Sequence, residues 1–95
     1  MTNSAFRSET EVEQKHRKLA MAAGWFVEKV KGVRKGFPDR FYAKAGRIVL
    51  LEWKKENNGR TAVIQALRHK QLREAGVEVY VVKTLDEANE ILGIP

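Results

Sequence analysis

Cysteine is absent from this chain of 95 residues, and histidine occurs only twice, as His16 and His69. Without cysteine there is neither a disulfide framework nor a thiolate metal site, and two histidines are too few for a four-ligand zinc site. No apolar run, including the strongly hydrophobic residues 48–51, approaches the ~20 residues that a transmembrane helix needs. The first eleven residues carry no apolar segment of the kind found in secretory signals. These absences predict a small soluble domain in the cytoplasm.

Acidic side chains are scarce relative to basic ones. The chain has 18 Lys and Arg against 12 Asp and Glu, which gives a net charge of +6 and a pI near 9.8. The imbalance lies in residues 1–60, where there are 14 basic and 7 acidic side chains, whereas residues 61–95 carry a net charge of −1. A basic surface favours a polyanion as partner, either a nucleic acid or an acidic membrane, although it can also serve solubility alone.

Internal repeats, low-complexity tracts and linkers rich in Pro, Gly or Ser are absent as well. We therefore expect residues 1–95 to form a single domain, with residues 1–7 frayed. The expected elements are a helix capped by Ser8 that ends at Ala23, strands at 25–30, 37–44 and 47–54, a helix at 61–75, a strand at 77–82, and a helix at 85–92 capped by Thr84 and Glu87.

The order of these elements predicts the fold class. Three strands joined by short connections form an antiparallel meander, and the helix that follows is long enough for a crossover to a parallel fourth strand. The expected architecture is an α/β domain in which helices flank a mixed sheet, in the order α-β-β-β-α-β-α.

Polar side chains end the otherwise apolar strand at 47–54. Because side chains alternate between the two faces of a strand, Glu52 and Lys54 share a face, with ~7 Å between their Cα atoms. A turn at residues 45–46 folds the preceding strand back, and Asp39 and Glu52 each lie six residues from that turn. We therefore expect Asp39 and Glu52 to lie across from each other on neighbouring strands.

Two carboxylates held this close repel each other, and a cation between them relieves the repulsion. Oxygen ligands of this kind suit a hard divalent ion such as Mg²⁺ or Mn²⁺, which can lower the pKa of bound water and stabilise charge on a phosphate. Lys54 could orient that water or neutralise the developing oxyanion. Asp39, Glu52 and Lys54 thus form a candidate hydrolytic phosphodiester site. The alternative on spacing alone is an exposed Glu–Lys pair at a strand end and an aspartate in a turn.

Four features stand in a fixed order along the chain: the run GFPDR, the strand RIVLLEWKK, a glutamine in the following helix, and the run GVEVYVV. Their residues Gly36, Pro38, Asp39, Glu52, Lys54, Gln65 and Gly76 match the pattern of the virus-type replication-repair nuclease domain, VRR-NUC. That family belongs to the PD-(D/E)XK nuclease superfamily. The resemblance extends from Glu13 to about Leu92. It implies a restriction-endonuclease-like sheet and a stand-alone protein of phage or bacterial type.

The resemblance implies a role for each polar residue of the set. Asp39 and Glu52 are implied as metal ligands, with the backbone carbonyl of Trp53 as a further ligand. Lys54 is implied as the catalytic lysine. Gln65 would contact metal-bound water, the lysine or the phosphate.

Two further positions carry weaker implications. Glu13 in the first helix matches a glutamate that the family often places there as a metal or water contact, with Glu9 and Glu11 as competing choices. His16 and His69 each lie one helical turn from an implied site residue. Either could touch phosphate, and the alternative is that both are partly buried spectators.

The implied partner is DNA, cleaved by a Mg²⁺- or Mn²⁺-dependent endodeoxyribonuclease. Contacts to its backbone would come from the basic residues Lys31, Arg34, Lys35, Arg40, Lys55 and Arg60. Nothing resembles a recognition helix, so we expect cleavage selected by DNA structure, such as Holliday junctions or flaps. Stand-alone members resemble Holliday-junction resolvases and act as dimers, which implies a homodimer. Its surface would lie in residues 77–92 or at the first helix, through Met21 and Trp25.

Two other classes of function stay open at this point. The chain could be a non-catalytic nucleic-acid-binding module on the same fold, although the complete set of Asp39, Glu52 and Lys54 argues against this. It could instead be a module that assembles on a helicase or another replication or repair protein.

Overall fold

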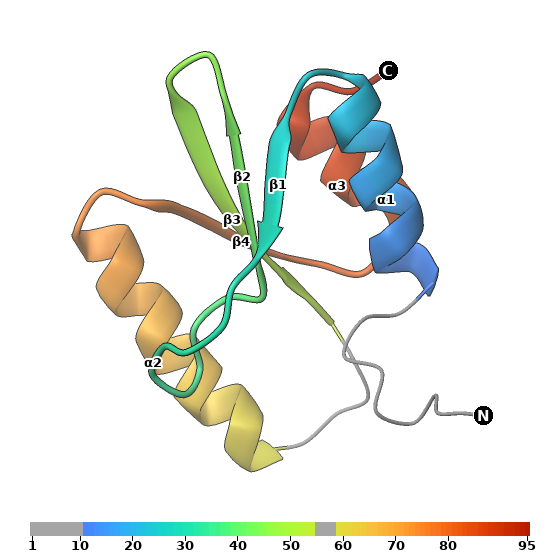
Figure 1. Ribbon diagram of the computed structural model, residues 1–95. Helices are drawn as coiled ribbons and strands as arrows, with labels where there is room; N and C mark the ends of the chain where they lie inside the picture. The colour runs from blue at the N-terminus through green and yellow to red at the C-terminus, as the bar shows by residue number, and fades with distance from the viewer. Residues whose placement is uncertain (1–10, 55–58) are drawn as a thin grey trace.

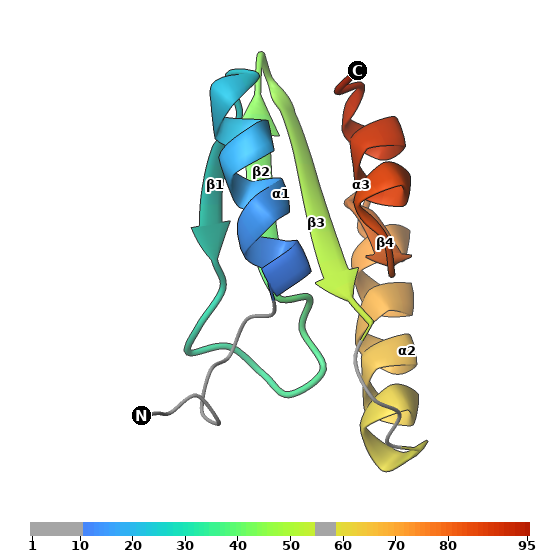
Figure 2. The ribbon, with the colours of Figure 1, turned by 90° about the vertical axis from the view of Figure 1, so that its right-hand side faces the viewer.

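A four-stranded mixed sheet with the strand order β1-β2-β3-β4 forms the centre of the computed structural model, which describes residues 11–54 and 59–95. The elements are α1 (Glu11–Ala22), β1 (Phe26–Lys29), β2 (Arg40–Lys44), β3 (Arg47–Trp53), α2 (Gly59–Glu74), β4 (Glu78–Val82) and α3 (Leu85–Leu92). Figures 1 and 2 show α1 and α3 on one face of the sheet and α2 on the other. The fold class and the element order predicted from the sequence are confirmed.

The largest difference from the expected strand boundaries is at β2, which begins at Arg40 instead of residue 37. The N–H of Phe37 donates to the carbonyl of Arg34 at 3.2 Å, which closes a turn. Pro38 has no N–H to give to a neighbouring strand, so the ladder starts only after it. The expected cap at Ser8 and the expected fraying of residues 1–7 lie outside the described residues.

The hairpin of β2 and β3 has the register that the sequence predicted. The turn residues 45–46 both have positive φ, +50° and +86°, as a tight two-residue hairpin turn requires. Arg40 pairs with Leu51, so Asp39 and Glu52 are the next facing positions beyond the ladder. β4 runs parallel to β3, as expected from the crossover through α2.

The core lies between the sheet and the layer of α1 and α3. Alternate residues of β3 point into it, and Val49, Leu51 and Trp53 are at most 2% exposed. They pack with Tyr42 of β2 and Leu92 of α3. The alternation that the sequence indicated for β3 is therefore the alternation of the folded strand.

Both ends of α3 are capped. The N–H of Glu87 donates to Oγ1 of Thr84 at 3.1 Å, and the N–H of Thr84 donates to Oε1 of Glu87 at 3.2 Å. This is the capping box predicted from the sequence. Gly93 ends the helix in the left-handed conformation. The caps fix the start and end of a helix whose Ala88 and Leu92 are buried in the core.

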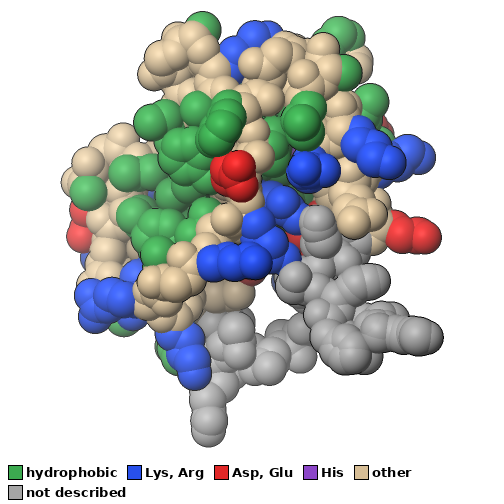
Figure 3. Space-filling model, in the orientation of Figure 1, with side chains coloured by type: hydrophobic (Ala, Val, Ile, Leu, Met, Phe, Trp, Pro, Cys, Tyr) green, Lys and Arg blue, Asp and Glu red, His purple; other side chains and the backbone are tan. Residues whose placement is uncertain are grey.

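The other face of the sheet is only partly covered. Leu50 and Val79 are buried there, whereas Phe26 and Ile48 remain about half exposed. Figure 3 shows hydrophobic side chains gathered on this side of the molecule, bordered by Lys and Arg. None of the described helices is long and apolar enough to cross a membrane.

His16 of α1 is fully buried in the core. Its Nδ1 lies 3.2 Å from the hydroxyl oxygen of Tyr42, and its ring centroid lies 5.4 Å from that of Trp53. Burial lowers the pKa of His16 from 6.5 to about 4, and a hydrogen bond with Asn89 opposes this shift. His16 is therefore neutral at pH 7 and out of reach of a phosphate. Of the two interpretations from sequence, the structure supports the buried spectator.

The connection from β1 to β2 packs tightly against α2 at Gly36. Gly36 has a φ of +88°, and a Cβ atom there would lie 2.6 Å from the carbonyl oxygen of Ile64. No side chain fits so close to a backbone atom, so glycine alone lets this connection approach the helix. Gly36 therefore holds the segment that leads to Asp39 against α2.

The burial of His16 predicts a stability loss in mild acid. The unfolded state takes up a proton near pH 6.5, whereas the folded state resists until about pH 4. The contribution is complete above pH 6.5, and its loss reaches about 3 kcal/mol at pH 4. Urea unfolding between pH 7 and 4 measures the decline. In His16→Gln, which cannot titrate, the decline should be smaller by that amount, and an equal decline would contradict this role for His16.

The close contact at Gly36 predicts an asymmetry between two glycines of one loop. Gly36→Ala should lower the Tm by roughly 10 °C, because positive φ and the overlap with Ile64 together cost on the order of 2 kcal/mol. Gly32→Ala is the matched control, since Gly32 has a φ of +72° but nothing lies within 4 Å of the added Cβ. Gly32→Ala should lower the Tm by roughly half as much, because only the cost of placing alanine at a positive φ remains. Equal shifts in thermal melts would rule out the tight contact.

Candidate active site at the end of β3

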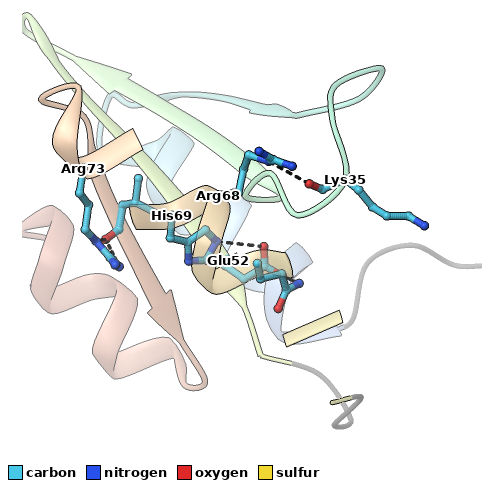
Figure 4. Close-up of polar contacts among 7 residues, drawn as sticks. Lys35, Glu52, Arg68, His69 and Arg73 are labelled. Atoms are coloured by element: carbon cyan, nitrogen blue, oxygen red, sulfur yellow. Dashed lines mark hydrogen bonds and ion pairs between the residues drawn. The ribbon is translucent and has the colours of Figure 1, made fainter. Parts of the chain in front are cut away.

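Glu52 is a buried carboxylate at the end of β3, only 4% exposed. Gln65 of α2 donates a hydrogen bond from Nε2 to Oε2 of Glu52 at 2.7 Å. His69, one turn further along α2, places its Nε2 3.9 Å from Oε1 of Glu52. Figure 4 shows His69 and Glu52 pointing toward each other. The hydrogen bond from Gln65 therefore orients the carboxylate, while His69 lies beside the other oxygen at a distance too long for a hydrogen bond.

The surroundings of His69 favour its neutral form. Burial lowers the pKa of His69 below its usual 6.5, the positive charge of Arg73 lowers it further, and the charge of Asp39 raises it. The sequence left His69 as either a phosphate contact or a spectator. The structure places it against Glu52 instead, a position that its spacing of four residues from Gln65 on one helix face could have indicated.

Asp39 lies just before β2, where it continues the strand register. Its carbonyl accepts a hydrogen bond from the N–H of Val30 at 2.8 Å, which ties this position to the end of β1. In the register it faces Glu52. Facing residues of an antiparallel pair share a face, so the carboxylate lies on the side of Glu52, which α2 covers. Its charge also acts on the pKa of His69. The structure thus brings Asp39, Glu52, Gln65 and His69 to one end of the sheet.

The peptide between Trp53 and Lys54 directs its two polar groups to opposite sides. The N–H of Lys54 donates to the carbonyl of Val82 in β4 at 2.8 Å. Because the peptide is trans, the carbonyl of Trp53 points the other way, toward β2 and Asp39. Strand alternation places Lys54, which is exposed, on the face of Glu52.

The donors at this site are oxygens, from the carboxylates of Asp39 and Glu52 and the carbonyl of Trp53. Within residues 11–54 and 59–95 there is no group of three or more acidic, histidine or cysteine side chains that could hold a metal ion by itself. A bound ion would therefore need the backbone carbonyl and water to complete its coordination. Two carboxylates, a carbonyl and water fit a hard ion such as Mg²⁺ or Mn²⁺.

Glu13 and Arg40 form a buried ion pair on the α1 side of the sheet. Oε1 of Glu13 lies 3.7 Å from Nη2 of Arg40, and the two side chains are 1% and 3% exposed. A buried guanidinium cannot reach a DNA backbone, so the expectation that Arg40 contacts DNA is wrong. The alternation of β2 explains the error, because Arg40 lies two residues from the buried Tyr42 and shares its face.

Three of the basic residues named from the sequence lie on one exposed loop. Lys31, Arg34 and Lys35 are all exposed in the connection from β1 to β2. Arg68 of α2, which the sequence did not single out, donates from Nε to the carbonyl of Lys35 at 3.1 Å and joins the loop to the helix. Lys55 and the side chain of Arg60 lie outside the described residues.

No family model matches the chain, and no curated protein matches it either. A solved structure described as "VRR_NUC domain" does match, with 26% sequence identity and a TM-score of 0.72. The match covers 86% of this chain and 90% of the solved one. It therefore spans most of the chain, at a similarity that extends to the sequence. The resemblance that the motifs indicated is confirmed: the chain folds as a VRR-NUC domain.

Proposed function

We propose that this chain is a metal-dependent endonuclease that hydrolyses phosphodiester bonds of DNA. The observation that carries the proposal is the buried carboxylate of Glu52, which is oriented by the hydrogen bond from Gln65, lies beside His69 and faces Asp39 in the strand register. A purely structural carboxylate gains nothing from a second carboxylate opposite it, because the two charges repel. A site that binds a cation gains from both carboxylates, because each of them attracts the ion.

Asp39, Glu52 and the Trp53 carbonyl would hold the Mg²⁺ or Mn²⁺ ion, which supplies an activated water and stabilises charge on the phosphate. Gln65 holds the carboxylate of Glu52 in place through its hydrogen bond, and His69 lies beside it. Lys54 follows the ligands on the same face, where its ammonium group can neutralise charge that develops on the phosphate. Glu13 takes no part in this proposal, because it is buried against Arg40 on the α1 side of the sheet.

Lys31, Arg34 and Lys35 would neutralise phosphates of the substrate, since all three are exposed on one loop beside α2. Such contacts position the DNA without reading its sequence. Branched DNA, such as Holliday junctions or flaps, is therefore the substrate class that we propose. A four-way junction needs two nicks related by symmetry, and a homodimer supplies them with one gene product.

The carboxylates give the first test of this proposal. Asp39→Asn and Glu52→Gln should each lower the cleavage rate at least ~1,000-fold, because each removes a charged ligand while keeping the volume of the side chain. The amide oxygen in Glu52→Gln can still accept from Gln65, so the fold should survive. Calorimetry with Mn²⁺ should show weakened metal binding in both variants. Full cleavage activity in either variant would contradict the assignment of these carboxylates to the active site.

Lys54→Ala provides the contrast within the same test. We expect it to reduce turnover by ~100-fold while metal binding stays nearly intact, because the charge acts on water or phosphate. If calorimetry shows that the variant no longer binds metal, the role given to Lys54 is wrong.

The second test concerns assembly and substrate. Light scattering at micromolar concentration should give a mass near twice 10.9 kDa. With Mg²⁺ or Mn²⁺, junctions and flaps should be cut faster than linear duplex. Of the two residues considered for a dimer surface at the first helix, Met21 of α1 is 49% exposed, whereas Trp25, which follows the helix, is only 6% exposed and cannot contribute. A monomer mass together with equal rates on junction and duplex would leave a monomeric nickase as the better description.

A further inference from the structure

A second feature lies beside the carboxylate site: an open pocket of about 560 Å³ between α2 and the loop that joins β1 to β2. Val33, Phe37 and Leu72 form its apolar wall, and the guanidinium groups of Arg34 and Arg68 line it as well. Pockets that hold small organic ligands have volumes of roughly 300–1,000 Å³ and combine apolar walls with few polar groups. The size and composition are therefore those of a binding pocket.

The walls of this pocket are held in place. Arg68 donates from Nε to the carbonyl of Lys35 at 3.1 Å and from Nη1 to Oε1 of Gln71 at 2.7 Å. Figure 4 shows the first of these contacts between the helix and the loop. The approach of Gly36 to Ile64 fixes the same loop against the same helix. The planar guanidinium of Arg68 thus has a set orientation on the pocket wall.

The same loop and the same helix carry residues of both the pocket and the proposed active site. Phe37 precedes Asp39 by two residues, and Arg68 directly precedes His69, which lies against Glu52. Among the described residues, no acidic side chain lines the pocket, and the neighbouring residues Lys31 and Lys35 of the loop are basic and exposed. A ligand that suits this pocket is therefore flat and apolar in its body and anionic at one end.

We propose that this pocket receives an unpaired nucleotide of the DNA substrate, an inference that rests on the proposed nuclease function. The base would lie against Phe37 and Val33, and the arginines would face its phosphate. A paired base stays stacked in the duplex, whereas a base at a bulge, flap or junction is free to enter such a pocket. The pocket would thus select branched DNA without reading sequence.

The test measures binding without catalysis. Fluorescence anisotropy in EDTA, at one fixed salt concentration, compares a DNA duplex that carries a single unpaired thymidine with the fully paired duplex. We expect the wild-type protein to bind the bulged duplex about tenfold more tightly, an effect typical of one stacked base. Equal affinity for the two duplexes would overturn the proposal.

Two variants and one control assign the preference to the pocket. Val33→Glu places an anion in the pocket at a position that is 50% exposed, so the fold should tolerate it. Arg68→Gln removes the fixed guanidinium. Lys70→Gln is the control, because it changes the net charge by the same amount on the same helix at a side chain that is 70% exposed. Val33→Glu and Arg68→Gln should reduce the preference for the bulge to less than about twofold, whereas Lys70→Gln should keep it.

A photo-crosslink adds a readout that does not depend on affinity. With 5-iodouracil as the unpaired base, irradiation should attach the DNA to Phe37, as identified by mass spectrometry. A crosslink to residues outside the pocket, or a preference that survives in Val33→Glu, would overturn the proposal. Cleavage of paired duplex by the wild-type protein with Mg²⁺ or Mn²⁺ is measured separately. If that cleavage occurs without a preference for the bulge, only the pocket assignment fails; if the preference exists without any cleavage, only the nuclease proposal fails.

Discussion

The orientation of one buried carboxylate, Glu52, determines how the rest of this fold is arranged. A carboxylate at the end of an apolar strand costs free energy unless hydrogen bonds compensate for the lost water. Here α2 supplies a hydrogen bond of 2.7 Å from Gln65, and the imidazole of His69 lies next to the carboxylate. The helix must therefore lie over the end of β3, and it leaves the far end of that face exposed at Phe26 and Ile48. This face of the sheet is therefore only partly covered because α2 lies over Glu52 at one end of it.

The second constraint is the loop that leads to Asp39. This loop must place the carboxylate of Asp39 opposite Glu52 in the strand register, and it must also contact α2. Gly36 makes the contact possible because it has no Cβ to overlap with Ile64. Arg68 of α2 also joins the helix to the loop, through its hydrogen bond to the carbonyl of Lys35. Helix, loop and strand end thus form one unit, in which a shift of the loop would move Asp39 relative to Glu52.

The parts of this arrangement that could be predicted are those that depend on local sequence. The alternation of β3, the distance of Asp39 and Glu52 from a common turn, and the capping box of α3 all follow from spacing along the chain. The orientation of α2 does not, because its exposed apolar residues Val63 and Leu67 define no stripe that faces the sheet. The contact of His69 with Glu52 and the pocket around Arg68 both depend on that orientation. Neither could be predicted without the tertiary packing.

The carboxylates of Glu13 and Glu52 have different electrostatic surroundings. Both are buried, and they are approached from opposite faces of the sheet. Glu13 lies 3.7 Å from Arg40, a permanent cation that compensates its charge within the fold. The groups that α2 places beside Glu52 are a neutral amide and an imidazole whose pKa is lowered by burial. The hydrogen bond from the amide orients the carboxylate, and neither group cancels its charge. A structural ion pair needs a partner of opposite charge, whereas a ligand for a cation needs an orientation and a charge that stays available. The placement of neutral groups on α2 gives Glu52 both.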